Sequence, residues 1–248
     1  MPPIYAPPGS PIGGGPGGAW TPTEALGFGW NAIMANFQGV ALPIAVLLLV
    51  VAVASGVPSG GLSAILTRVA IEVVDPGFLP FINLFIQLLG HMIGLVVSSY
   101  FMGGVAEFAL KVARGQTPAF NDVFGGGKYF GPMFVANLLS QFGVGIGFAF
   151  CIAPGLILAA GLSMYQSLIV DQKLSGVDAL KKSWEMTTGH KGTLVVYVLL
   201  CMLVAAAGAL ACCVGALLVS GPMITIASAY IYLKLTGEQP RLPAKLGQ

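Results

Sequence analysis

Polar side chains recur along one face of an apolar segment in the first half of the chain. Asn83, Gln87 and His91 follow one another at intervals of four residues, so a helix would place them on one face. A second polar group, in the next apolar segment, consists of Asn137, Ser140 and Gln141. Such amide, hydroxyl and imidazole groups either hydrogen-bond neighbouring membrane helices together or line the pathway of a ligand, proton or ion. The sequence leaves both hypotheses open.

The other reactive side chains form no pattern typical of catalysis. The four cysteines lie inside apolar runs with no acid or histidine nearby, at Cys151, Cys201, Cys212 and Cys213. This placement is typical of small buried residues rather than of a metal site or a disulfide. The sequence shows no recognisable phosphate-binding loop, catalytic triad or pair of catalytic carboxylates. We therefore predict no cofactor, no metal and no enzymatic activity, with a membrane-embedded lipid enzyme as the alternative.

The elements that carry these side chains must lie in a membrane. Charged residues make up 8% of the 248 residues and the mean hydropathy is +0.87, whereas soluble domains carry about 25% charged residues. Residues 129–170 and 192–233 contain no charged residue. A transmembrane helix needs about 20 apolar residues, so each run is long enough for two spans and a turn. The sequence therefore predicts an all-α, polytopic membrane helix bundle.

We predict six spans, grouped as three hairpins. Their approximate ranges are 40–57, 81–106, 131–152, 156–170, 193–211 and 216–233. A short amphipathic helix is predicted before each hairpin, and we call these three segments the lead-in helices. They begin with "TPTE" at residue 21, "TPAFNDVF" at residue 117 and "SGVD" at residue 175. The first and third are typical helix starts, because a Thr or Ser is followed three residues later by an acid.

The lead-in helices also indicate an internal repeat. The pattern Ala-Leu-x-x-x-Trp begins at residue 25 and again at residue 179, and a weaker version begins at residue 119. We predict a membrane domain over residues 21–240, with repeats at about 21–116, 117–174 and 175–240. Residues 1–20 are rich in Pro and Gly and are predicted to be a disordered cytoplasmic tail. Residues 241–248 are predicted to be a second, short cytoplasmic tail.

The lead-in helices are predicted to lie in the membrane interface. Tryptophan favours the headgroup level and lysine can meet anionic lipid phosphates. The predicted lipid contacts are Trp30, Lys181, Lys182 and Trp184. The first lead-in helix is almost uncharged, and packing against protein is its alternative. The outer segment, residues 58–80, is predicted to lie on the outer surface of the bilayer, with a plug over a pore as the alternative.

Basic residues predict the orientation of the chain in the membrane. If both termini lie on one side, that side carries ten of the eleven lysines and arginines, and the other side carries only Arg68. Loops rich in lysine and arginine stay in the cytoplasm. Both termini and the three lead-in helices are therefore predicted to be cytoplasmic.

One stretch resembles a known family. "LIVDQKLSGVDALKKSWEMTTGHK", which follows a span that starts at Pro154-Gly155, resembles the membrane domain attached to some bacterial glycerophosphodiester phosphodiesterases and to related standalone six-span membrane proteins. The likeness extends over about residues 20–240 and includes the start "YFGPMF" of the third span. It implies a multi-pass helical protein of the bacterial cytoplasmic (inner) membrane. The chain has no room for a soluble phosphodiesterase barrel of about 250 residues, so we predict no diesterase activity.

The sequence favours a non-enzymatic integral membrane scaffold or accessory subunit. Its predicted partners are membrane lipids and another membrane protein or a larger membrane complex, and no nucleic acid. The alternative is a transporter or channel for a small molecule or ion, which would use the polar residues of the second and third spans.

Overall fold

The computed structural model describes residues 20–56, 63–73, 75, 77–116, 120–210 and 215–242. These residues form helices and contain no β-strand, so the predicted all-α fold is confirmed. The first half comprises α1 (Pro22–Ala35), the π-helix η1 (Phe37–Ala41), α2 (Leu42–Gly56), α3 (Ser63–Val73), α4 (Leu79–Ala113) and the 3₁₀ helix η3 (Phe120–Tyr129). The second half comprises α5 (Phe130–Phe150), α6 (Ile152–Gly161), α7 (Tyr165–Gln172), α8 (Gly176–Thr187), α9 (Lys191–Leu210), the π-helix η4 (Ala216–Ser220) and α11 (Gly221–Thr236).

The chain is a membrane protein, and its described residues include five helices that are long and apolar enough to cross a bilayer. They are Leu79–Ala113, Phe124–Phe150, Ile152–Gln172, Lys191–Leu210 and Leu218–Thr236. A sixth crossing is possible only if α1 and the η1–α2 segment count as one span, and they are bent by 112° where they meet. The predicted first span at 40–57 corresponds to the end of η1 and α2. The bend separates α1 from it, and without α1 the η1–α2 segment is not among the five candidate spans.

The lead-in helices α1 and α8 begin where the sequence predicted. The Thr21 hydroxyl accepts a hydrogen bond from the backbone N–H of Glu24, and the Glu24 carboxylate accepts one from the N–H of Thr21, which completes a capping box. Ser175 caps α8 in the same way through the N–H of Asp178. These bonds satisfy backbone donors that a helix start otherwise leaves free. Both helix starts are therefore specified locally.

The second lead-in segment, which was predicted as a short amphipathic helix, is not an α-helix. Residues 117–119 lie outside the described residues, and the chain from Phe120 to Tyr129 is a 3₁₀ helix. It contains the consecutive glycines at 125–127, which disfavour an α-helix. A Cβ atom on Gly126 would lie 2.3 Å from the carbonyl oxygen of Tyr100 in α4. Glycine is therefore needed for the close approach of η3 to α4.

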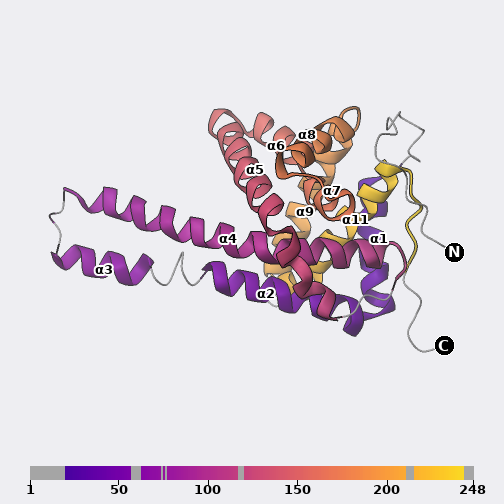
Figure 1. Cartoon of the computed structure of the whole chain (residues 1–248), viewed down its shortest axis with the longest axis horizontal. Helices are drawn as coiled ribbons and strands as arrows, with labels where there is room; N and C mark the ends of the chain where they lie inside the picture. Colours follow the sequence, from indigo (N-terminus) through magenta and orange to yellow (C-terminus); the bar gives the residue numbers. More distant parts are fainter. Residues whose placement is uncertain are drawn as a thin grey trace.

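Each lead-in segment packs against the helix that ends another predicted hairpin (Figure 1). η3 packs on α4, α8 packs on α7, and α1 packs on α11. A Cβ atom on Gly29 of α1 would lie 2.5 Å from the carbonyl oxygen of Met223, so the backbones of α1 and α11 are in close contact. The α1 contact brings the first lead-in helix onto the last helix of the chain. The three contacts therefore join the N-terminal, middle and C-terminal thirds of the bundle.

The core lies where α4, α7 and α11 meet. Its fully buried large side chains include Leu168 and Ile169 of α7 and Ile231 and Tyr232 of α11. Phe108 of α4 belongs to a second buried cluster, together with Ile33 of α1 and Ile44 of α2. Trp20 belongs to the core between α4, α7 and α11, so the predicted tail ends before this residue. The rest of the predicted tail, residues 1–19, lies outside the described residues. Arg241, in the predicted C-terminal tail, donates its backbone N–H to the Ala113 carbonyl at 2.8 Å.

A long helical arm extends away from this core (Figure 1). It consists of α3 and the N-terminal half of α4, with α2 leading towards it from the body. The Thr67 hydroxyl in α3 donates a 2.6 Å hydrogen bond to the Asn83 side-chain oxygen in α4. α3 thus runs alongside the membrane-spanning helix α4. A helix that lay flat on the outer surface would instead cross the end of α4. The exposed apolar side chains on the arm include Ile65, Val69, Phe81, Leu84 and Phe85.

Candidate functional site

The two predicted polar groups meet at one point. The Nε2 atom of His91 in α4 lies 2.9 Å from the side-chain oxygen of Gln141 in α5, at hydrogen-bonding distance. Both side chains are exposed on the outside of the single chain. The residues therefore join two helices at the protein surface, and they do not line an internal space.

Asn137 is the centre of a buried polar cluster that joins three helices. Its side-chain nitrogen donates to the Ser99 hydroxyl in α4 at 2.8 Å, and the Tyr165 hydroxyl in α7 donates to its side-chain oxygen. Ser99 in turn donates to the Leu95 carbonyl at 2.7 Å. The prediction found Asn137 but missed Ser99 and Tyr165. Ser99 continues the four-residue spacing of Asn83, Gln87 and His91 after the apolar Leu95, and this spacing could have indicated it. The only signal for Tyr165 is a hydroxyl group in an apolar run.

The remaining predicted polar residues are not part of this cluster. Asn83 bonds Thr67 in the arm, as described above, and Gln87 is exposed one turn further along α4. Ser140 is half-buried in α5 beside Gln141. The six predicted residues are therefore distributed over the arm, the α4–α5 surface and the buried cluster.

The predicted lipid-contacting residues divide into two kinds. Trp30 is 46% exposed and Lys181 is also exposed, as a lipid contact requires. Trp184 packs on protein instead, because a Cβ atom on Gly161 would lie 2.4 Å from its ring. Lys182 donates to the Gln172 side-chain oxygen at 2.6 Å. The apolar face of α8 is therefore turned towards α6 and α7.

Ser183 explains why α8 docks at this place. Its hydroxyl donates to the Gly161 carbonyl at 2.9 Å and accepts from the backbone N–H of Met164 at 3.2 Å. Thr187, one turn later, donates to the same Gly161 carbonyl at 3.1 Å. These bonds satisfy backbone groups at the break between α6 and α7, where helical bonding is interrupted. The third lead-in helix therefore caps a broken membrane span.

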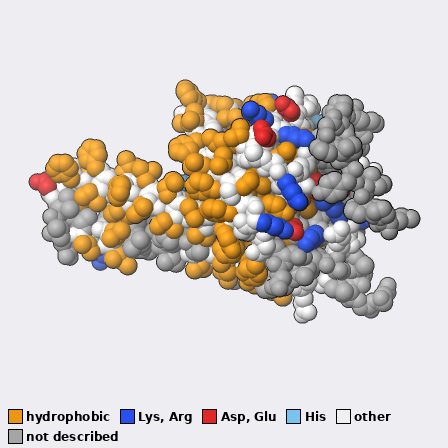
Figure 2. Space-filling view, in the orientation of Figure 1, with side chains coloured by type: hydrophobic (Ala, Val, Ile, Leu, Met, Phe, Trp, Pro, Cys, Tyr) orange, Lys and Arg blue, Asp and Glu red, His pale blue; other side chains and the backbone are white. Residues whose placement is uncertain are grey.

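Lysine and arginine side chains gather at the end of the body opposite the arm (Figure 2). Arg114, at the end of α4, pairs with Asp171 of α7 at 2.8 Å and with both carboxylate oxygens of Glu238 at 2.9 Å. Burial by itself lowers the pKa of Arg114, but hydrogen bonds and charges from Glu238 and Asp171 outweigh burial and raise this pKa. Tyr232 of α11 also donates to Asp171 at 2.8 Å. The network ties together the ends of α4, α7 and α11.

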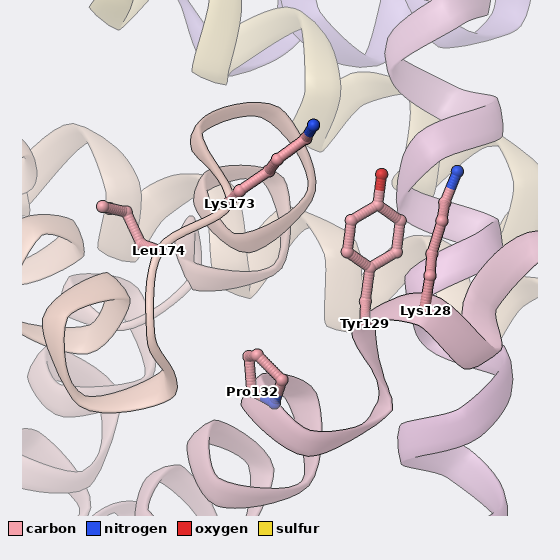
Figure 3. A pocket seen from close by; sticks show the side chains of 5 residues that line it. All are labelled: Lys128, Tyr129, Pro132, Lys173 and Leu174. Atoms are coloured by element: carbon pink, nitrogen blue, oxygen red, sulfur yellow. The ribbon is translucent and has the colours of Figure 1, made fainter. Parts of the chain in front are cut away.

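A pocket of about 370 Å³ opens at this same basic end. Its walls come from the end of η3, the start of α5 and the linker between α7 and α8, and the lining residues are Lys128, Tyr129, Pro132, Lys173 and Leu174. Figure 3 shows that the polar ends of Lys128, Tyr129 and Lys173 point to one side, whereas Pro132 and Leu174 line the rest. Both lysines belong to the basic residues that predict the cytoplasmic side, but nothing in their separation of 45 positions indicates a shared pocket.

Comparisons with known proteins give no independent assignment. The chain matches no known protein family, no curated protein and no solved structure. The resemblance to the membrane domain of the glycerophosphodiester phosphodiesterases therefore stays a prediction. Among the described residues, no group of three or more histidine, cysteine, aspartate or glutamate side chains could hold a metal ion.

Proposed function

We propose that this protein is a non-enzymatic membrane scaffold or accessory subunit, and that another membrane protein packs along the arm. The observation that carries the proposal is the outward position of Gln87 and His91. Both side chains are exposed within the apolar helix α4. Polar groups are costly in lipid and ordinarily face protein or water. A neighbouring helix that offers hydrogen-bonding groups would cover them.

The position of the polar groups supports this proposal over transport. A transport pathway needs polar side chains that face a common internal space. Gln87 and His91 instead lie on the outside, and Asn137 is occupied by bonds to Ser99 and Tyr165. Interhelical bonds of this kind contribute about 0.6 kcal/mol each to membrane helix packing. The buried polar cluster is therefore well accounted for by helix association.

We also propose the finer topology predicted from the sequence. The contacts of η3 with α4, α8 with α7 and α1 with α11 support three repeated hairpins, because each lead-in segment meets the last helix of one predicted repeat. The basic end of the body supports an orientation in which both termini face the cytoplasm. The proposed location is the inner membrane of a bacterium.

Site-specific photo-crosslinking in the native membrane tests the scaffold proposal. A photo-reactive amino acid is placed at Gln87, and the matched control is Met202, which is 51% exposed on the apolar helix α9. We expect a discrete protein adduct at position 87 and only lipid adducts at position 202. The mass of the adduct distinguishes a different membrane protein from a second copy of this chain.

Two results would contradict the proposal. Lipid adducts alone at position 87 would mean that no protein covers the arm. A solute flux into liposomes that is abolished by His91→Leu would instead favour the transport alternative, because the proposed scaffold needs no flux.

A further inference from the structure

We propose that the pocket between the end of η3, the start of α5 and the α7–α8 linker binds the phosphate headgroup of an anionic phospholipid. The inference goes beyond the scaffold proposal, because this pocket lies at the basic end of the body and the crosslinking test concerns the arm. It rests on the polar side chains of the pocket, on the backbone that presents Lys173, and on the apolar surface below.

The polar side chains suit a phosphate group. Lys128 and Lys173 each offer a positive charge with up to three N–H donors, and the Tyr129 hydroxyl offers a further donor (Figure 3). Because Lys128 is already paired with Glu107, the uncompensated positive charge at the pocket comes from Lys173, and Lys128 and Tyr129 add N–H and O–H donors for the phosphate oxygens. The Lys128 ammonium is also held 2.8 Å from the Glu107 carboxylate, which fixes its position at the pocket.

The backbone presents Lys173 in a way that costs conformational energy. Its φ of 52° and ψ of 35° are left-handed, and in the described part of the chain no other residue except glycine has a positive φ. Glycine or asparagine ordinarily takes this conformation at the end of a helix. A lysine here therefore needs a reason other than local folding. The linker is also fixed on its far side, because a Cβ atom on Gly176 would lie 2.5 Å from the Pro132 carbonyl oxygen.

Lys173 remains available for a ligand. In the described part of the chain, no carboxylate lies within ion-pair distance of its ammonium, whereas Lys128, Arg114 and Lys111 all pair with acids. Its side chain is exposed and lines the pocket. An incoming phosphate would therefore replace water around Lys173 and would not have to break an existing ion pair.

The surface below the pocket suits an acyl chain. Pro132 begins a stripe on α5 that continues through the exposed side chains of Val135, Leu139 and Phe142. These positions are three or four residues apart, so they lie on one face of the helix. Ten residues of helix extend for about 15 Å, which is half the hydrocarbon thickness of a bilayer. A phosphate in the pocket would thus place its lipid tail along an apolar track, which favours a phospholipid over a soluble phosphate compound.

The test uses the full chain in nanodiscs of phosphatidylcholine with and without phosphatidylglycerol, followed by native mass spectrometry of the retained lipid. We expect the wild type to retain phosphatidylglycerol and Lys173→Gly to reduce its occupancy about five-fold, the effect of one lysine near a membrane surface. Glycine also suits the left-handed backbone, so this variant should fold at least as stably as the wild type. Lys173→Arg should retain the lipid.

Arg241→Gln is the matched control, because Arg241 is an exposed basic residue that does not line the pocket and is not among the predicted lipid contacts. An equal loss of lipid in Arg241→Gln and Lys173→Gly would overturn the proposal, since it would reflect general surface charge. Absence of retained phosphatidylglycerol in the wild type would overturn it as well. Saturable binding of glycerol 3-phosphate without lipid retention would assign the pocket to a soluble phosphate compound and reject the lipid. None of these results depends on an adduct at Gln87.

Discussion

Alanine substitution of Gly29 in α1 is the sharpest test of how the lead-in helices are used. If α1 lay on lipid, Gly29→Ala would stabilise the helix by about 0.8–1 kcal/mol, because alanine favours the helical state over glycine by that amount. In the structure, however, the added Cβ atom would lie 2.5 Å from the backbone oxygen of Met223. A backbone oxygen cannot turn aside as a flexible side chain can, so α1 and α11 would have to separate.

The magnitude follows from these two opposing effects. Overpacking a well-packed contact costs about 1–3 kcal/mol, and a clash with backbone belongs near the upper end. After subtracting the helix preference of about 1 kcal/mol, we expect a net loss of about 2 kcal/mol in the free energy of unfolding. Gly27 is the matched control in the same helix, because its Cβ atom would have nothing within 4 Å. Gly27→Ala should therefore stabilise the protein by about 1 kcal/mol.

Reversible unfolding in mixed detergent micelles, followed by tryptophan fluorescence, measures both variants. Trp20 and Trp30 flank the substituted positions, so the signal reports on this part of the fold. Gly29→Ala should be about 2 kcal/mol less stable than the wild type, and Gly27→Ala should be about 1 kcal/mol more stable. The two variants should therefore differ from each other by about 3 kcal/mol in the free energy of unfolding. Equal stabilisation by both substitutions would refute the packing of α1 on α11 and would favour a lead-in helix that lies on lipid.

Two further substitutions test the polar contacts in the same unfolding assay. Arg114→Gln removes the ion pairs with Asp171 and Glu238. We expect the free energy of unfolding to fall by about 2 kcal/mol, since hydrogen bonds to charged groups contribute about 1.5–3 kcal/mol. A fall below about 0.5 kcal/mol, the contribution of an exposed ion pair, would show that the network is dispensable. Asn137→Leu removes two interhelical bonds and should cost about 1.2 kcal/mol, twice the loss in His91→Leu, which removes one. The reverse order would contradict the assignment of Asn137 to packing.

The sequence predicted individual residues of the candidate sites better than it predicted which of these residues meet. It identified Asn137, His91 and Gln141 as polar residues of two successive apolar segments, and the structure buries Asn137 and joins His91 to Gln141 at 2.9 Å. It missed Ser99, although Ser99 continues the four-residue spacing of His91, because the intervening Leu95 is apolar. Lys128 and Lys173 line one pocket because the fold brings the end of η3 and the α7–α8 linker together, and no spacing along the chain encodes this.

The sequence alone determined that the chain is an all-helical membrane protein and where α1 and α8 begin. Both follow from local physics: residues without charge must leave water, and Thr21 and Ser175 satisfy the first backbone donors of their own helices. Only the tertiary structure decided which helices meet, and it did so through small residues such as Gly29 and Gly161. Lipid and the protein interior are similarly apolar, so membrane helices gain little free energy from turning one apolar face inward. Their partners are selected instead by the steric fit between backbones and by a few interhelical hydrogen bonds.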